Sequence, residues 1–145
     1  MTTTVKETEH LYGYEERIKL SSSREVEKFL RPLFSEIDDV ESFHVVVVNR
    51  NHQVIAHRMI GLGGISGCVA DPKLIFRFAL MQKSVGGIVI SHNHPSGNLT
   101  PSQSDIDLTR KVKEAGKFLE LQLLDHIILS PVEGKYYSFA DNGML

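Results

Sequence analysis

Two histidines stand two residues apart in the middle of the sequence. His92 and His94 follow the apolar run 86–91, and Pro95 comes directly after them. Side chains two apart on a strand point to the same side, so we expect both imidazoles at the carboxyl end of one strand. Open α/β sheets commonly bind ligands at that edge. The spacing is compatible with a paired-imidazole site, although for an isolated H-x-H two polar residues at a fraying strand end are the more common explanation.

A carboxylate follows where it can reach the same centre. Thr100, Pro101 and Gln103 have the pattern of a helix start, with an N-cap, a proline at the first helical position and a capping box. Apolar residues then repeat at helical spacing from Asp105: Leu108, Val112, Ala115 and Leu119. Asp105 therefore heads the core-facing stripe, where an unpaired charge is very costly. Because a helix N-terminus contributes only about 0.3–1 kcal/mol, a cation shared with the imidazoles is the better explanation.

Two imidazoles and one carboxylate predict a zinc site whose fourth position is open, as in catalytic sites. The ligand types alone do not exclude iron, cobalt or manganese. Bound zinc lowers the pKa of its water to about 7 and polarises a carbonyl, and a hydrolase of this kind also needs a base. Ser102 lies three residues before Asp105, on nearly the same helix face, so its hydroxyl can approach the same centre.

The elements that position these residues alternate between helices and strands. Ser22 and Glu25 have capping-box spacing, and Pro32 should kink or end the helix that they begin. The run 43–48 contains four valines and predicts a strand that is covered on both faces. The other expected elements are strands at 54–60, 86–91, 121–129 and 136–139 and helices at 71–82 and 101–117. This order predicts a mixed α/β fold.

Length and composition limit the class of protein. The 145 residues have the length of one domain, and 41% hydrophobic with 23% charged residues is typical of globular proteins. Residues 1–20 are polar without periodicity, so we expect an N-terminal arm before a domain over residues 21–145. A net charge of −2 gives no general attraction to nucleic acid or anionic membrane. Without a signal peptide or membrane-spanning run, we expect a cytoplasmic protein that binds no membrane.

The motif residues also resemble a known family. His92-x-His94-Pro95 followed by Ser102-x-x-Asp105 resembles the metal motif of the JAB/MPN (JAMM) metalloproteases. Neighbouring stretches resemble the bacterial RadC-type branch of that family: residues 92–97, Pro101-Ser102, Leu124-Asp125-His126 and Tyr137-Ser138-Phe139. The resemblance covers roughly residues 20–145. It implies a single-domain α/β fold, namely a mixed-sheet JAB/MPN sandwich of the cytidine-deaminase-like type with flanking helices.

The resemblance also implies an activity. A JAB/MPN protein is expected to be a zinc metallopeptidase or isopeptidase that hydrolyses an amide bond of a peptide or protein. His92, His94 and Asp105 would hold Zn²⁺, and Ser102 would hydrogen-bond the oxyanion. Glu41, which precedes the strand that begins near Phe43, matches the place of the family's catalytic base. Spacing alone leaves three alternatives for that base: Glu36, Asp38 and Asp39.

A second hypothesis is a DNA-repair-associated or interaction module that keeps the fold without proteolysis. Longer RadC-type members carry an N-terminal helix-hairpin-helix module, and we expect this chain to lack it. Basic residues on the helix 101–117 alternate with acidic ones at i,i+4 spacing, so we expect a solvated, salt-paired face there and no strong nucleic-acid binding. The sequence does not determine the oligomeric state.

The remaining candidates are weaker. The glycine-rich stretch 61–67 lacks the third glycine of a dinucleotide fingerprint, and we do not expect it to bind phosphate. The single cysteine, Cys68, excludes an internal disulfide and is expected to be structural. Asp125 and His126 are adjacent in an apolar strand. They are compatible with a pair that orients a metal ligand and equally with a hydrogen-bonded core histidine.

Overall fold

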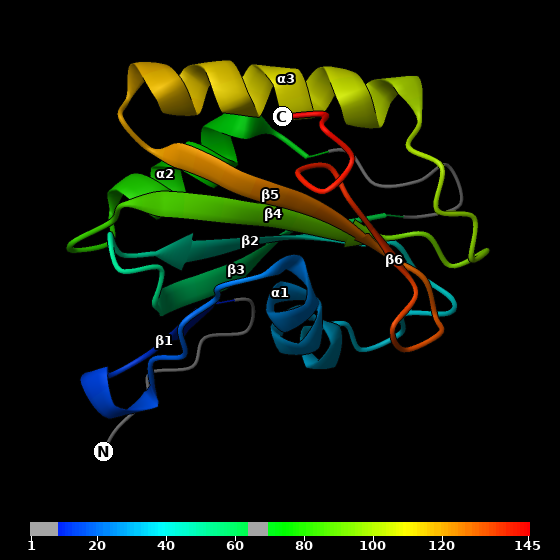
Figure 1. The fold of residues 1–145 in the computed structure, drawn as a ribbon, viewed down its shortest axis with the longest axis horizontal. Helices are drawn as coiled ribbons and strands as arrows, with labels where there is room; N and C mark the ends of the chain where they lie inside the picture. The colour runs from blue at the N-terminus through cyan, green and yellow to red at the C-terminus, as the bar shows by residue number, and fades with distance from the viewer. Residues whose placement is uncertain (1–8, 64–69) are drawn as a thin grey trace.

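The computed structural model describes residues 9–63 and 70–145, and a central sheet organises them (Figure 1). The strands are β1 (Glu9–Leu11), β2 (Ser42–Val48), β3 (Val54–Leu62), β4 (Gly87–Asn93), β5 (Gln122–Leu129) and β6 (Tyr136–Ser138). The helices are α1 (Ser23–Leu30), α2 (Pro72–Leu80) and α3 (Gln103–Phe118), with short 3₁₀ turns η1 (Tyr14–Glu16) and η2 (Arg31–Leu33). Within these residues, no helix is both long and apolar enough to cross a bilayer.

The six strands form one mixed sheet in the order β1-β3-β2-β4-β5-β6. Strands β2 and β3 form the expected antiparallel hairpin, and β2 pairs antiparallel with β4. Strands β4 and β5 are parallel, which requires the crossover connection that α3 supplies. The expected mixed α/β fold is confirmed.

Helices cover both faces of this sheet. Figure 1 shows α3 along one side of the sheet and α1 on the opposite side. Val45 and Val47 pack in the core with residues of α2 and α3, whereas Val46 and Val48 pack with α1. All four valines are completely buried. The strand covered on both faces that the valine run predicts is therefore β2.

The N-terminal segment differs from the expected arm. Residues Glu9–Leu11 form β1, an edge strand paired antiparallel with β3, and Lys19 forms an isolated bridge with Gln53. Leu20 is buried with the α1 side of the core. The described part of the segment, residues 9–20, is thus attached to the sheet. Three residues are too few for a visible alternation of polar and apolar side chains, so β1 could not be predicted from periodicity.

The helix boundaries agree with the sequence except at one place. Helix α1 ends at Leu30 and continues as η2, which contains Pro32, and α2 begins at Pro72 after its N-cap Asp71. For α3 the expected cap at Thr100 is wrong, because Ser102 is the N-cap. Its hydroxyl accepts a bond from the Asp105 N–H, and the Asp105 carboxylate accepts one from the Ser102 N–H. Asp105 therefore sits in the first turn of the helix.

Two strands are longer than expected. Strand β3 runs to Leu62, so the beginning of the glycine-rich stretch belongs to the sheet. The rest of that stretch, from Gly64 on, and Cys68 lie outside the described residues. Strand β4 continues to Asn93, so His92 is a strand residue paired with Phe43 of β2, and His94 follows directly.

Candidate metal centre

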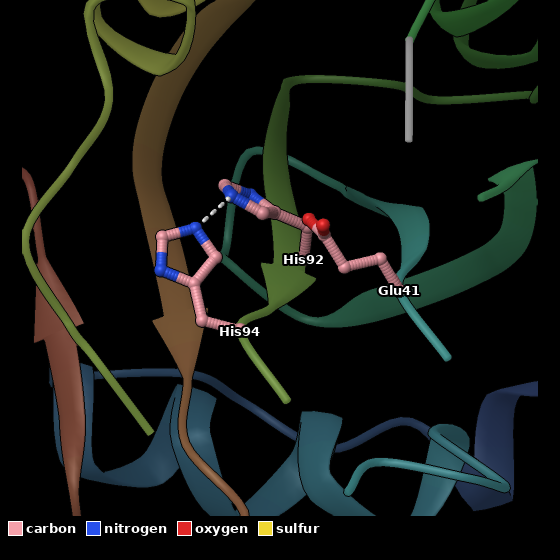
Figure 2. Close-up of side chains that lie close together, drawn as sticks. All are labelled: Glu41, His92 and His94. Carbon is pink, nitrogen blue, oxygen red and sulfur yellow. Dashed lines mark hydrogen bonds between the residues drawn. The ribbon is translucent and has the colours of Figure 1, made fainter. Parts of the chain in front are cut away.

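The two imidazoles meet at the end of β4, as the spacing predicts. Figure 2 shows the rings of His92 and His94 turned toward each other, with their Nε2 atoms 3.1 Å apart. His92 is only 3% exposed, and Phe43 stacks on its ring at a centroid distance of 5.7 Å. The backbone N–H of His94 donates to the carbonyl of Leu129, so β5 fixes the chain just beyond the strand.

Asp105 reaches both rings from the first turn of α3. Its Oδ1 lies 3.2 Å from the Nε2 of His92, and its Oδ2 lies 3.4 Å from the Nε2 of His94. Ligand atoms bound about 2.0–2.1 Å from a tetrahedral zinc are roughly 3.3 Å apart. The three separations of 3.1, 3.2 and 3.4 Å match that value. The structure therefore brings together the three residues predicted as ligands with the spacing of a tetrahedral metal.

Hydrogen bonding leaves one ring nitrogen of His94 free to bind a metal. Its Nδ1 lies 2.6 Å from the carbonyl oxygen of Asn98, which can only accept a hydrogen. Nδ1 must carry the hydrogen, and the Nε2 of the neutral ring then presents a lone pair toward Asp105. A main-chain carbonyl such as that of Asn98 is a common hydrogen-bond acceptor for the second ring nitrogen of a metal-bound histidine.

The electrostatics of the cluster favour a positive charge at its centre. Burial raises the pKa of Asp105, but its contacts with the imidazoles of His92 and His94 outweigh burial and hold the pKa well below its usual value. The hydrogen bond with Asp105 raises the pKa of His94, partly opposed by burial. Both shifts have one cause besides burial, which is the attraction between the Asp105 carboxylate and the neighbouring imidazoles. A divalent cation supplies the charge that this donor set stabilises.

Glu41 is a second carboxylate close to the two imidazoles. It precedes β2, and Figure 2 shows its carboxylate directed toward His92. Ligand atoms of Glu41, His92 and His94 all lie within 4.8 Å of one another, so these three side chains could hold a metal ion. Among the ion pairs of residues 9–63 and 70–145, the imidazoles pair with Asp105 and not with Glu41. Asp105 is thus the nearer carboxylate and Glu41 the more distant one.

The other acids considered as a base are less well placed. Glu36, Asp38 and Asp39 are exposed, whereas Glu41 is half-buried beside the histidines. Among the four acids, the geometry favours Glu41.

Asn93, which stands between the two histidines, is a residue that the sequence analysis missed. Its completely buried side chain points to the opposite face of the sheet. Its Oδ1 accepts from the Ser42 N–H at 2.8 Å, and its Nδ2 donates to the carbonyls of Ile37 and Val40, both at 2.9 Å. These bonds hold the backbone on either side of Glu41. An asparagine in an H-x-H motif looks like a spacer, so spacing carried no signal for this role.

Behind the centre lies a buried histidine, His126 of β5. Its Nε2 is 2.9 Å from the Nδ1 of His92, and its Nδ1 is 2.6 Å from the hydroxyl of Thr109. Burial lowers the pKa of His126 well below its usual value, so the ring is neutral at pH 7. His126 is thus a hydrogen-bonded core histidine, and one of its two hydrogen-bond partners is His92.

Asp125 does not orient the imidazole of His126. Its carboxylate accepts from the backbone N–H groups of His126 and Ala140 and from the hydroxyl of Ser138. Burial raises the pKa of Asp125, partly offset by these bonds. Its role is to fix the turn after β6 against β5.

The Ser102 hydroxyl is at the N-terminus of α3, next to Asp105. Its oxygen accepts from the Asp105 N–H at 3.0 Å and lies 3.0 Å from the hydroxyl of Ser104. Because the bond with Asp105 uses a lone pair, the hydroxyl hydrogen remains available to a ligand or to Ser104. Ser102 is exposed.

A pocket of about 280 Å³ opens beside the imidazole of His92. Its apolar part consists of Phe43, Ala70, Pro72 and Leu108. Ser104, Asp107 and Lys111 of α3 form its polar part. The volume suits one side chain of a bound molecule, and His92 and Asp105 lie in its wall.

The fold and these residues define a JAB-type domain, in which a histidine pair at the end of a strand faces an aspartate at the start of the next helix. Residues 20–144 match the RadC-like JAB domain, and the chain belongs to that family.

Several bacterial proteins are similar to this chain. A UPF0758 protein of Flavobacterium johnsoniae is 39% identical over 126 residues, which cover 87% of this chain and 53% of the relative. A UPF0758 protein of Symbiobacterium thermophilum is 33% identical over 129 residues, covering 89% and 53%. One of Listeria monocytogenes is 41% identical over 103 residues, covering 71% and 45%. The chain thus spans about half the length of these relatives.

Proposed function

We propose that this protein is a zinc-dependent hydrolase of amide bonds, of the metallopeptidase or isopeptidase type. One observation carries the proposal, which is that two imidazoles and the Asp105 carboxylate converge at separations of 3.1, 3.2 and 3.4 Å while a second carboxylate, Glu41, lies farther out. Three protein ligands and an open fourth position are typical of catalytic rather than structural zinc.

Each residue of the centre has a role in this proposal. His92, His94 and Asp105 hold the ion. Zinc in such a site lowers the pKa of a bound water and polarises a substrate carbonyl. Glu41 accepts a proton at its carboxylate and returns it to the departing nitrogen. Its place suits this role, because it lies close to His92 and His94 without forming an ion pair with either. Ser102 donates its hydroxyl hydrogen to the carbonyl oxygen of the substrate as negative charge develops there.

The substrate proposed is a peptide or protein. The pocket beside His92 has an apolar part that suits one aliphatic or aromatic side chain next to the cleaved bond. Of the basic residues of α3, Arg110 is offset by an ion pair with Asp107 at 3.5 Å, and the net charge of the chain is −2. We therefore propose peptide binding and no strong binding of nucleic acid.

The test compares zinc-loaded wild type with Glu41→Gln on quenched-fluorescence libraries of peptides and of lysine isopeptides. Both proteins should contain about one zinc per chain by elemental analysis, as a three-ligand site predicts. Wild type should cleave at least one library, and the variant should lose about 10²–10⁴-fold in rate, which is the usual contribution of a general base.

Two outcomes would contradict the proposal. Fully active Glu41→Gln would remove Glu41 from the reaction. Zinc-loaded wild type that cleaves neither library, but shifts DNA in gels at about 50 mM salt, would favour the DNA-associated module instead.

A further inference from the structure

The buried side of the candidate centre contains hydrogen bonds that the roles above do not use. His126 is completely buried and lies between His92 and Thr109. Thr109 is also buried, and it lies one helical turn after Asp105 on α3. Its hydroxyl is 2.6 Å from the main-chain carbonyl oxygen of Asp105.

The direction of each bond follows from the groups at its ends. A main-chain carbonyl can only accept, so the single hydroxyl hydrogen of Thr109 is donated to Asp105. The Thr109 oxygen must then accept from the other neighbour, the Nδ1 of His126. In the neutral ring of His126, an Nδ1 that carries the hydrogen leaves Nε2 as an acceptor. That acceptor faces the Nδ1 of His92, which must therefore carry a hydrogen.

We propose that Thr109 and His126 are positioning residues that hold His92 in the tautomer with hydrogen on Nδ1. The Nε2 of His92 then presents its lone pair to the space shared with His94 and Asp105. In the opposite tautomer, Nε2 would carry a hydrogen aimed at Asp105, 3.2 Å away, and would be blocked as a metal ligand. The inference rests on the proposed zinc centre for its purpose, although the tautomer itself is a property of the chain alone.

A series of hydrogen bonds connects two groups of Asp105 with one imidazole. Its main-chain carbonyl accepts from Thr109, and the series continues through His126 to the Nδ1 of His92. The Asp105 carboxylate lies 3.2 Å from the Nε2 of the same ring. The residues involved come from three adjacent elements, β4, α3 and β5. The ring of His92 is thereby fixed in rotation as well as in protonation, as outer partners of metal-bound histidines do elsewhere.

The first experiment reads the tautomer directly. Long-range ¹H–¹⁵N spectra of the metal-free, full-length protein labelled at histidine nitrogen distinguish ring nitrogens with and without hydrogen. The signals of His92 among the seven histidines are assigned by their loss in His92→Ala. We expect the Nδ1 of His92 to carry hydrogen. A dominant form with hydrogen on Nε2 alone would overturn the proposal.

The second experiment removes the hydrogen bonds that Thr109 makes. Thr109→Val keeps the shape and removes the hydroxyl, whereas Thr109→Ser keeps it and serves as the matched control. By competition with a chelator, zinc affinity should fall about 10–100-fold in Thr109→Val, the usual effect of losing an outer partner. Thr109→Ser should retain nearly wild-type affinity and the wild-type tautomer.

A merely structural role would lower stability in Thr109→Val without changing the tautomer of His92 or the affinity for zinc, and that result would contradict the proposal. If Thr109→Val does not fold, the spectrum of the wild type decides. Because the tautomer is measured without metal or substrate, the inference can hold even if the protein hydrolyses no substrate. Failure of the proposed function is thus distinguishable from failure of this inference.

Discussion

The side-chain oxygen of Asn93 accepts a hydrogen bond from the backbone N–H of Ser42 at 2.8 Å. This bond connects the strand that carries His92 to the segment that carries Glu41. Because the same side chain also donates to the carbonyl of Val40, the backbone is held on both sides of Glu41. Asn93 therefore helps to set the position of the proposed base, Glu41, relative to His92 and His94.

Replacing Asn93 should separate metal binding from turnover. Asn93→Ala leaves the Ser42 N–H and the partly buried carbonyls of Ile37 and Val40 without this partner, which should cost about 1–3 kcal/mol for each group that water does not reach. Zinc content should be unchanged, because the side chain faces away from the ligands. Turnover of the substrate found with the libraries should fall. Ser91→Ala is the matched control, since Ser91 lies on the same face of β4 and bonds to Ile127 of β5 instead. Equal turnover losses in the two variants would contradict the positioning role.

Removing a ligand should remove both zinc and its contribution to stability. An ion that binds only the folded state adds about 2.7 kcal/mol when its concentration is 100 times Kd. A strong chelator should therefore lower the melting temperature of wild type and leave that of Asp105→Asn unchanged. Asp107→Asn, at an exposed acid of the same helix, should behave as wild type. A chelator effect that persists in Asp105→Asn would show that the stabilising ion binds elsewhere.

Two histidines outside the centre should make the protein sensitive to acid. Burial, assisted by His10, lowers the pKa of His57 to about 4, and burial, assisted by His57, lowers the pKa of His44 to about 4. Their unfolded values are near 6.5. Between these values the unfolded chain binds more protons, so stability is full above about pH 6.5 and falls as the pH drops toward 4.

Urea unfolding across this range tests the histidine effect. His57 packs among the rings of Tyr12 and Phe29, so His57→Phe keeps its aromatic contacts and removes the titration. The variant should lose stability less steeply on acidification than wild type. His52→Asn, at an exposed turn residue with φ of 58°, should keep the wild-type slope. An unchanged slope in His57→Phe would assign the acid sensitivity to other groups.

Gly116 should resist replacement although it lies within a helix. A Cβ at this position would stand 2.3 Å from the main-chain oxygen of Leu121, where the chain turns from α3 into β5. Alanine favours helices over glycine by about 1 kcal/mol, but the clash should outweigh this gain. We expect Gly116→Ala to lower the free energy of unfolding by about 1–3 kcal/mol, as overpacking does. Glu114→Ala, on the exposed face of α3, is the control, and equal stability of the two variants would contradict the expectation.

The parts of the centre that follow from local periodicity could be predicted from the sequence. Alternation along a strand places His92 and His94 on one side, and helical spacing places Asp105 at the head of a buried stripe. The cap of α3 could not be chosen this way, since both Thr100 and Ser102 have an acceptor hydroxyl and a polar residue three positions later. The contacts that Asp105 makes with Ser102 and the histidines place the N-cap of α3 at Ser102.

The residues that the sequence could not assign are those whose partners are distant along the chain. His126 was recognisable as a candidate partner of a ligand, but its neighbour Asp125 turned out to bind backbone groups. Thr109 and Asn93 have no distinctive spacing, because Thr109 binds a residue of β5 and Asn93 binds the start of β2 and the segment before it. Contacts of this kind depend on the order of the strands in the sheet, and the periodicity of a sequence does not determine that order.

The parallel pairing of β4 with β5 through α3 has a consequence for the order of assembly. His92, His94 and Asp105 all lie within residues 92–105, and closing so short a segment costs little chain entropy. Glu41 reaches them only after β2 has paired with β4, a contact between residues about fifty positions apart in sequence. Under the proposed roles, the three metal ligands are neighbours in the chain, whereas the proposed base joins them only in the completed sheet. We therefore expect a nascent chain to bring the three ligands together before Glu41 reaches them.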